Sequence, residues 1–382
     1  MKFLHLGDLH FGKKLMEFEL IDDQRYIADE ILRIVREKEV DAVLIAGDVY
    51  DKSQPPESAV LLLDSFLNSL SEMNKEVYMI SGNHDSDERL SFGSRLFEKN
   101  GIYISSMFDG KLFRHTAEDE HGELDIWLMP FVKASKVRNF YDGIESYDDA
   151  VKAIIDHSDI DASRRNILVA HQFVAGNSAP QCAGSENART RNVGTVEAIS
   201  YRNFDAFDYV ALGHIHSPQK IGREEIRYSG SPLKYSLSEV NNEKSVPIIT
   251  IEEKGEVNIE LVPLVPKRNL RHLKGKLEDL IRAENIVDPE DFIYLTLTDE
   301  DTAYNAMSRA QQYYPNTLKI DYDNSHSKGS SIVSAFDGDE DKSFEDIFAE
   351  FYMQMYGCEI SDEEMKYIIK IAEEAGVTDE AD

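Results

Sequence analysis

Aspartate, asparagine and histidine residues recur in five short motifs, each directly after an apolar run rich in β-branched residues. Imidazole and carboxylate together suit Mn, Fe, Zn or Ni, whereas an all-oxygen set would suit Mg or Ca. The motifs therefore indicate ligands for transition-metal ions. The seven candidate ligands are Asp8, His10, Asp48, Asn83, His171, His214 and His216.

Seven donors of this mixed kind are more than one ion usually takes from protein. Two ions that share Asp48 as a bridging carboxylate would use them all and leave positions open for water and substrate. Ions about 3.5–4 Å apart can hold a hydroxide and clamp the attacking and leaving oxygens of a phosphate. Asp8 and His10 are two residues apart, as are His214 and His216, so an extended backbone would point each pair to one side.

The elements that must position these ligands are predicted to be strands. A short apolar run bounded by turn residues is typical of a buried strand. In open α/β sheets, ligands bind outside the carboxyl ends of the strands, so we expect all five motifs at one edge of one sheet. The five runs are residues 3–6, 42–46, 77–80, 167–170 and 209–212.

Each motif alone also has an ordinary structural explanation. A lone buried histidine is more often hydrogen-bonded core than a ligand, and an aspartate after a strand often begins a turn or caps a helix. The Gly-Asn-His-Asp segment at 82–85 could be only a turn, which Asp85 is expected to fix. Five such strand ends together would rarely arise by chance.

The motifs Asp-x-His, Gly-Asp-x-x-Asp, Gly-Asn-His-Asp, a lone His and Gly-His-x-His, in this order, resemble the calcineurin-like metallophosphoesterases. Segments 1–13, 45–51 with Pro55-Pro56, and 228–233 resemble a narrower branch, the DNA nuclease subunits that assemble with a coiled-coil ATPase. The resemblance covers roughly the first 265 residues. It implies a four-layer α/β/β/α sandwich with a small α+β capping domain and a C-terminal helical tail.

The resemblance also implies a role for each motif residue. His84 falls where the family keeps a non-ligand histidine that contacts the scissile phosphate and assists the leaving oxygen, a role that suits an imidazole. Asp51 matches the acid that orients this histidine in many relatives. The two ions, usually Mn²⁺ in this branch, are expected on Asp8, His10, Asp48 and His216, and on Asp48, Asn83, His171 and His214.

These residues predict hydrolysis of a phosphodiester by a metal-activated water without a covalent intermediate. The sequence has no Gly-x-x-x-x-Gly-Lys-Ser/Thr loop, so the chain itself is not expected to hydrolyse ATP. The leading hypothesis is a nuclease that cuts double-stranded DNA ends and hairpins, with entry controlled by the implied ATPase. The alternatives are a phosphodiesterase for small or cyclic esters, and a non-catalytic scaffold, against which His84 argues.

The net charge of −31 is unusual for a protein of this kind, because nucleic-acid binders usually carry a basic surface. Binding depends on local potential, however, and two metals would add up to four positive charges at the site. DNA affinity is expected to depend on the partner and to fall steeply with salt. Basic residues near the motifs are candidate DNA contacts or else solvated charges: Lys13, Lys14, Arg89, Arg95, Arg189 and Arg191.

Cys182 and Cys358 lie far apart in the sequence and give no disulfide framework, which suits a reducing compartment. No apolar run approaches the ~20 residues of a membrane span. The chain begins on a motif-bearing strand rather than on a cleavable signal. The sequence therefore predicts a cytoplasmic protein without a membrane segment.

The chain divides into four predicted parts. Helical spacing covers 21–35 and 60–70, the second entered through Pro55-Pro56. Family members dimerise through helices of this half, so a homodimer within a heterotetramer is expected; simple packing of 60–70 on the sheet is the alternative. The parts are a nuclease domain (1–265), a capping domain (268–323), a flexible linker (324–342) and a partner-binding segment (343–376).

Smaller elements are predicted around these boundaries. Segments 226–228, 246–251 and 257–262 have the pattern of consecutive antiparallel strands. The capping domain is expected to run through helix 273–283, strand 292–297, helix 303–312 and strand 318–322.

The C-terminal segment has the pattern of two amphipathic helices after a polar linker. Ser361 and Glu364 have capping-box spacing for the second helix. Such helices are suited to docking on another chain, and the resemblance implies the base of the ATPase coiled coil; folding back on this chain is the alternative. Candidate contact residues are Phe344, Ile347, Phe348, Phe351, Met355 and Ile368.

Overall fold

The structure, a computed structural model, describes residues 1–176, 178–182, 198–301 and 304–324, together with 348, 352, 360–361 and 364–369. The chain forms two compact units, Met1–Arg271 and His272–Asp382. The predicted break at 265–268 lies just before this boundary, and the other predicted limits stay predictions. The predicted linker, apart from residue 324, lies outside the described residues.

Two six-stranded sheets form the first unit, with the orders β16-β15-β1-β4-β5-β6 and β13-β14-β12-β9-β8-β7. The central strands of each sheet run parallel to one another. The first sheet contains β1 (Lys2–Leu6), β4 (Ala42–Ala46), β5 (Glu76–Ile80), β6 (Ile102–Ser105), β15 (Ser245–Ile251) and β16 (Val257–Pro263). The second contains β7 (Phe113–Asp119), β8 (Gly122–Met129), β9 (Arg165–His171), β12 (Tyr209–Gly213), β13 (Gln219–Ile221) and β14 (Arg223–Tyr228).

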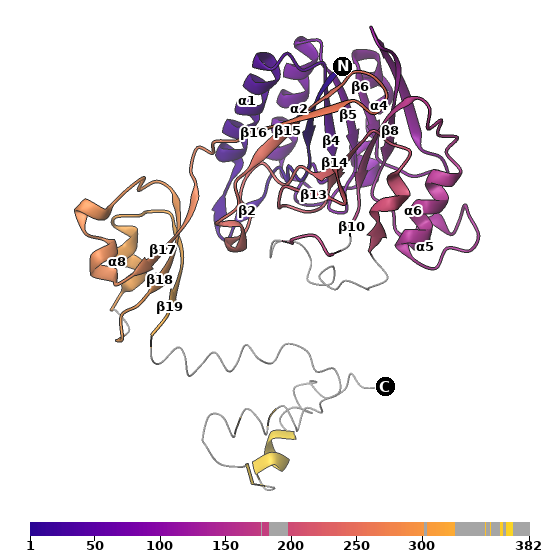
Figure 1. Ribbon diagram of the computed structural model, residues 1–382. Coiled ribbons are helices and arrows are strands. Elements are labelled where there is room, and N and C mark those ends of the chain that lie inside the picture. Colours follow the sequence, from indigo (N-terminus) through magenta and orange to yellow (C-terminus); the bar gives the residue numbers. More distant parts are fainter. Residues whose placement is uncertain are drawn as a thin grey trace. The chain divides into compact units, whose positions relative to one another are not determined.

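The two sheets pack face to face around a shared apolar core. Phe3 and Leu44 enter it from the first sheet, and Leu128 and Val169 from the second. Figure 1 shows helices α1 (Ile21–Glu37) and α2 (Glu57–Glu72) on one side of the sheets and α5 (Ala134–Val137) and α6 (Tyr147–Asp156) on the other. The unit is therefore the expected four-layer α/β/β/α sandwich.

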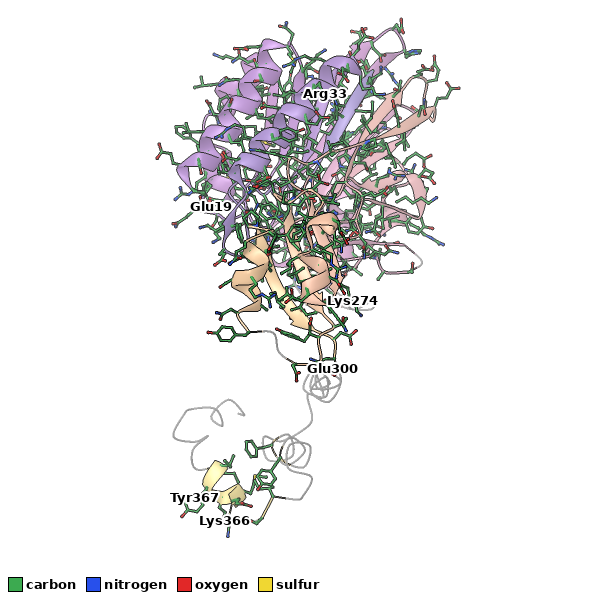
Figure 2. All side chains as sticks on the ribbon, turned by 90° about the vertical axis from the view of Figure 1, so that its left-hand side faces the viewer. Glu19, Arg33, Lys274, Glu300, Lys366 and Tyr367 are labelled. Atoms are coloured by element: carbon green, nitrogen blue, oxygen red, sulfur yellow. The ribbon has the colours of Figure 1, made fainter. Side chains whose placement is uncertain are left out.

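The helices begin and bury their faces where the sequence predicts. In α1, Ile27, Ile31 and Ile34 are buried at helical spacing, while Arg33 lies on the exposed face (Figure 2) and pairs with two glutamates. Helix α2 starts directly after Pro56. Both predicted helices, 21–35 and 60–70, are confirmed.

The prediction of three consecutive antiparallel strands over 226–262 is wrong in one respect. β15 and β16 are antiparallel neighbours at the edge of the first sheet. β14, however, belongs to the second sheet and runs parallel to β12. An apolar pattern identifies a strand but not the sheet that it joins, and residues 229–244 carry the chain from one sheet to the other.

The second unit contains a three-stranded sheet with the order β17-β18-β19. Its apolar core includes Ile293, Leu295 and Tyr314. The surface-exposed Lys274 on β17 (Figure 2) pairs with a carboxylate at the end of β19. The elements are β17 (Leu270–Gly275), α7 (Leu277–Leu280), β18 (Phe292–Leu297), α8 (Ala306–Gln311) and β19 (Thr317–Tyr322).

The helix predicted over 273–283 is largely wrong, because β17 extends to Gly275 and α7 covers Leu277–Leu280 alone. Cross-strand contacts explain the difference. The His272 ring stacks on Tyr294 at 4.5 Å between centroids, and His272 Nε2 lies 2.8 Å from Thr296 Oγ1. These contacts with β18 override the local helical spacing.

Near the C-terminus, the structure describes a helical segment at 364–369. The predicted capping box is confirmed: Ser361 N donates to the Glu364 carboxylate at 3.0 Å, and Glu364 N donates to Ser361 Oγ at 3.3 Å. Tyr367 is 72% exposed on this helix (Figure 2). Of the predicted contact residues, Phe348 and Ile368 are half-buried, and Phe344, Ile347, Phe351 and Met355 lie outside the described residues.

Among the described helices, none combines the length and the apolar character that a membrane crossing requires.

Candidate metal centre

The five motifs follow five parallel strands, but these strands belong to both sheets. Asp8, Asp48 and Asn83 follow β1, β4 and β5 of the first sheet, while His171 ends β9 and His214 follows β12 of the second. The prediction of one edge of one sheet is therefore wrong. Because the sheets pack face to face, the site lies where their two carboxyl edges meet.

At four of the seven ligands the backbone has a positive φ angle rather than an extended conformation. The φ angles are 54° at Asp8, 45° at His10, 47° at Asp48 and 99° at His214. Residues other than glycine rarely have positive φ angles, and they keep them only where surrounding contacts hold the backbone. Here Asp8 N donates to Gly47 O at 3.1 Å and His10 N to Asp48 O at 2.9 Å. The expected extended spacing is wrong, but each pair of side chains still reaches the site.

The first ligand group contains Asp8, His10 and His216, whose ligand atoms lie within 4.8 Å of one another and are buried. His10 Nε2 lies 3.1 Å from His216 Nε2 and 3.7 Å from Asp48 Oδ2. Burial holds the pKa of His10 well below its ordinary value, so the ring is neutral and carries a lone pair. This group fits one divalent cation.

The second group contains Asp48, Asn83, His171 and His214. Asn83 Oδ1 lies 3.1 Å from His171 Nε2 and 2.9 Å from His214 Nδ1, and Asp48 Oδ2 lies 3.4 Å from His171 Nε2. His171 Nδ1 donates to Ala46 O at 2.7 Å, which leaves Nε2 for a metal, as in most metal-binding histidines. Asp48 is therefore close to both groups, as a bridging ligand must be.

The charges of the second group also fit a cation. Burial disfavours a charged His171, but the Asp48 carboxylate outweighs burial and raises the pKa of His171 to about 9. Without a metal, His171 therefore carries a positive charge beside Asp48, and a metal bound at Nε2 would replace that charge. Burial and the charge on His171 lower the pKa of His214 to about 3, so His214 stays neutral. The residues present fit two divalent cations.

His84 lies beside the ligand groups, half-buried, with its ring centroid 4.9 Å from that of His10. His84 Nδ1 lies 2.9 Å from the backbone oxygen of Asp51, which leaves Nε2 for substrate. The Asp51 carboxylate instead accepts a hydrogen bond from Lys13 Nζ at 2.6 Å. Asp51 thus contacts His84, as predicted, but through its main-chain carbonyl rather than its carboxylate.

Asp85 fixes the turn, as predicted. Its carboxylate accepts hydrogen bonds from Gly82 N at 2.9 Å, Tyr50 N at 2.9 Å and Val49 N at 3.1 Å. These bonds tie the loop after β5 to the loop after β4. Asp85 therefore holds Asn83 and His84 in register with Asp48.

Sequence reasoning missed the buried ion pair behind His216. Glu239 Oε1 lies 3.5 Å from His216 Nδ1, and Lys244 Nζ lies 2.6 Å from the Glu239 carboxylate. Lys244 also donates to the His216 backbone oxygen at 2.8 Å. A carboxylate on the second ring nitrogen orients a metal-binding histidine. In the sequence, both residues are indistinguishable from ordinary surface charges.

Two further residues that sequence reasoning missed support the first motif. Gln24 Nε2, from helix α1, donates to His10 O at 2.7 Å, and the Tyr235 hydroxyl donates to Leu9 O at 2.5 Å. Gln24 stands at helical spacing with Ile27 and Ile31, and a polar residue on this apolar face is the signal that could have identified it.

Gly213 is essential for the contact between the two sheets. A Cβ at this position would lie 1.9 Å from Ala46 O and 2.8 Å from His171 Nδ1. We expect Gly213→Ala to lower Tm by roughly 3–10 °C through overpacking, and to lower metal content because it disturbs the anchor of His171.

Thermal unfolding and metal analysis check this expectation. Gly176→Ala is the matched control, since its Cβ would have an ordinary nearest contact of 3.4 Å. Equal Tm and equal metal content in the two variants would contradict the steric argument.

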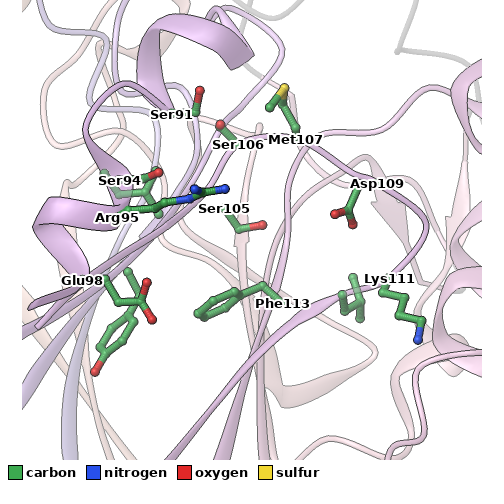
Figure 3. A pocket seen from close by; sticks show the side chains of 13 residues that line it. Ser91, Ser94, Arg95, Glu98, Ser105, Ser106, Met107, Asp109, Lys111 and Phe113 are labelled. Carbon is green, nitrogen blue, oxygen red and sulfur yellow. The ribbon is translucent and has the colours of Figure 1, made fainter.

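The predicted DNA contacts occupy different surroundings. Lys14 pairs with Glu19 at 3.0 Å. Arg89 lines a partly apolar pocket beside α2. Arg95 lines a separate pocket of about 470 Å³ with Ser94 and Ser105 (Figure 3), and no predicted metal ligand lines that pocket. Arg189 and Arg191 lie outside the described residues. Contact of any of these residues with DNA stays a prediction.

Comparison with known proteins agrees with this fold and ligand set. The family model for calcineurin-like phosphoesterases matches residues 1–218. The chain therefore belongs to the calcineurin-like phosphoesterase family. A second family model, described as the type 5 capsule protein repressor C-terminal domain, matches residues 266–356.

Within that family, the chain is 35% identical over 328 residues to the SbcD subunit of the SbcCD nuclease of Staphylococcus epidermidis, a match that covers 84% of this chain and 85% of that protein. This similarity assigns the chain to the SbcD branch. Among solved structures, a dimetal phosphatase from Danio rerio shares 10% identity with a TM-score of 0.40, covering 69% of this chain and 96% of that one. GAP50 of Plasmodium shares 16% with a TM-score of 0.39, covering 69% and 89%. These structural likenesses are too remote to add to the assignment.

Proposed function

We propose that this chain is the nuclease subunit of an SbcCD-type complex and hydrolyses DNA phosphodiesters at a dinuclear metal centre. The observation that carries the proposal is the position of Asp48, whose Oδ2 lies 3.4 Å from His171 Nε2 and 3.7 Å from His10 Nε2. A carboxylate between two ligand groups is what a bridged metal pair requires. The likeness to the SbcD subunit of an SbcCD nuclease supports DNA as the substrate.

The bound metals would supply an activated water and neutralise charge on the phosphate. The chain's own residues do the rest. Asp8, Asp48, Asn83 and the four ligand histidines would hold the cations, while Asp85 and Glu239 hold the loops and rings of these ligands in place. His84 Nε2, with Nδ1 bonded to Asp51 O, is the proton donor for the leaving oxygen.

Further parts of the proposal concern the cofactor and the partners. We expect Mn²⁺ as the metal, since the mixed imidazole and oxygen donors accept it. We expect a coiled-coil ATPase of the SbcC type as the partner, two copies of this chain in a heterotetramer, and double-stranded and hairpin DNA as substrates for ATP-dependent end processing. Location in the cytoplasm stays a prediction.

The purified chain, with and without the coexpressed ATPase, tests the proposal. Both forms would be given hairpin-ended duplex DNA and a small chromogenic phosphodiester with Mn²⁺. Cleavage of DNA ends and hairpins by the complex, dependent on ATP, is the expected result. Hydrolysis of the small ester without any DNA cleavage would instead favour a phosphodiesterase for small or cyclic substrates.

The two helices predicted for the C-terminal segment carry a separate prediction. Deletion of 343–382 should abolish capture of the ATPase but leave hydrolysis of the small ester within about twofold, because the ligands of the metal centre all lie in the first unit. Co-purification on a tagged ATPase measures capture. A deletion variant that is captured as well as the full chain would refute docking through these helices.

A further inference from the structure

A sixth strand, β8, ends at the same edge as the metal ligands. β8 runs parallel to β9, with Met129 beside Ala170, so its carboxyl end emerges next to His171. The residues that follow include Phe131 and Lys133. Phe131 N donates to Ser81 O at 3.0 Å, a bond that ties this loop to the loop after β5 of the other sheet.

Phe131 joins the loop to the metal centre. Its ring lies nearly parallel to that of His214, with 6.5 Å between centroids and 20° between planes, and edge-on to His171 at 6.3 Å. A pocket of about 590 Å³ opens here, lined by the ligand Asn83 and by Phe131, Lys133 and Lys136. One predicted ligand thus lines the pocket, and an elongated substrate held at this ligand would extend over it.

The acids in this pocket are committed to other partners. The Asp85 carboxylate accepts three backbone N–H bonds, Asp87 pairs with Lys136 at 3.1 Å, and Glu88 accepts from Ser86 Oγ at 3.1 Å. Lys133 is exposed, and among the residues that the structure describes no carboxylate pairs with it. Among the described residues, Lys133 thus forms no ion pair, and it lines the same pocket as the ligand Asn83 in a chain of net charge −31.

We infer that this pocket is a nucleotide subsite, in which Lys133 binds the phosphate next to the scissile one and Phe131 forms an apolar wall for the adjoining nucleoside. The inference rests on the proposed nuclease function. A lysine contributes to such binding as a point charge on phosphate, and an aromatic ring gives sequence-independent contact with a nucleoside. The positive charge of Lys133 would also explain how an acidic chain can bind the negatively charged DNA strand locally.

The test compares cleavage of hairpin-ended duplex DNA by the ATPase complexes of the wild-type chain and of Lys133→Gln, with Mn²⁺ and ATP at 50 and 200 mM salt. Loss of one phosphate contact reduces the slope of log affinity against log salt by about 0.7–0.9. The variant should have a raised KM, and the ratio of variant to wild-type KM should shrink about threefold between the two salt concentrations. Lys133→Arg should restore the wild-type salt slope, because it keeps the charge.

Lys99→Gln is the matched control. Lys99 is also exposed, but it lies in the 3₁₀ turn just before β6 and so at the amino edge of the first sheet. The subsite is overturned if the wild-type complex cuts DNA and Lys133→Gln has the same KM and salt slope as the wild type and as Lys99→Gln. If the wild-type complex with the ATPase binds two metals and hydrolyses a small ester but no DNA, the proposed function itself fails, and the subsite fails with it.

Discussion

His84→Ala should lower kcat for DNA hydrolysis by about 10²–10⁴-fold while leaving two metals bound. The expected loss follows from position, since His84 Nδ1 is bonded to Asp51 O and Nε2 is left to donate a proton. The defect should shrink for a chromogenic ester, because a nitrophenolate leaves without protonation. Rate measurements on both substrates, with metal analysis of the same samples, check this result.

His121→Ala is the control for this variant. His121 lies in the turn between β7 and β8 and pairs with Glu253 at 3.2 Å, at the amino end of β8 and away from the ligands. Its rate should match that of wild type. An equal defect of His84→Ala on DNA and on the nitrophenyl ester would show that His84 does not act as the proton donor.

Asp48→Asn should reduce bound metal from two ions per chain to one or fewer and lower the rate by about 10³-fold or more, since a metal supplies several kcal/mol of charge stabilisation. The amide keeps the size of the side chain and can still accept from His84 N, which donates to Asp48 Oδ1 at 2.8 Å. The substitution removes the negative charge of Asp48, which lies close to both ligand groups. Metal analysis after gel filtration measures the change.

A second buried aspartate provides the comparison. Asp125 is 1% exposed on β8 and pairs with Arg164 at 2.9 Å, outside the metal centre. Asp125→Asn should retain both metals and full activity even if it unfolds at a lower temperature. Two metals in Asp48→Asn at wild-type affinity would remove Asp48 from the bridging position.

The sequence was sufficient to predict the site because its ligands follow strands in short, recognisable motifs. Asp8, Asp48 and His171 could be placed at the ends of strands without coordinates, since apolar runs bounded by turn residues mark buried strands. Helices α1 and α2 and the capping box at Ser361 could be predicted equally well, because their signals are local in the sequence.

What the sequence could not predict depends on contacts between distant segments. The division of the ligands over two sheets is set by packing, which the strand pattern does not encode. Glu239 and Lys244 are charged residues whose burial is visible only once the chain is folded. Lys133 follows a strand with no metal ligand at its end, so its position beside Asn83 depends on the pairing of β8 with β9. Strand β17 likewise includes residues that were predicted to be helical, because its contacts with β18 join separate segments of the chain.

Anomalous diffraction at the manganese edge, from crystals of this chain grown with MnCl₂, tests the dinuclear centre most directly. We predict two peaks about 3.5–4 Å apart, with Asp48 between them, His10 and His216 beside one, and His171 and His214 beside the other. A single peak, or peaks that Asp48 does not contact, would contradict the dinuclear site on which the proposed chemistry depends.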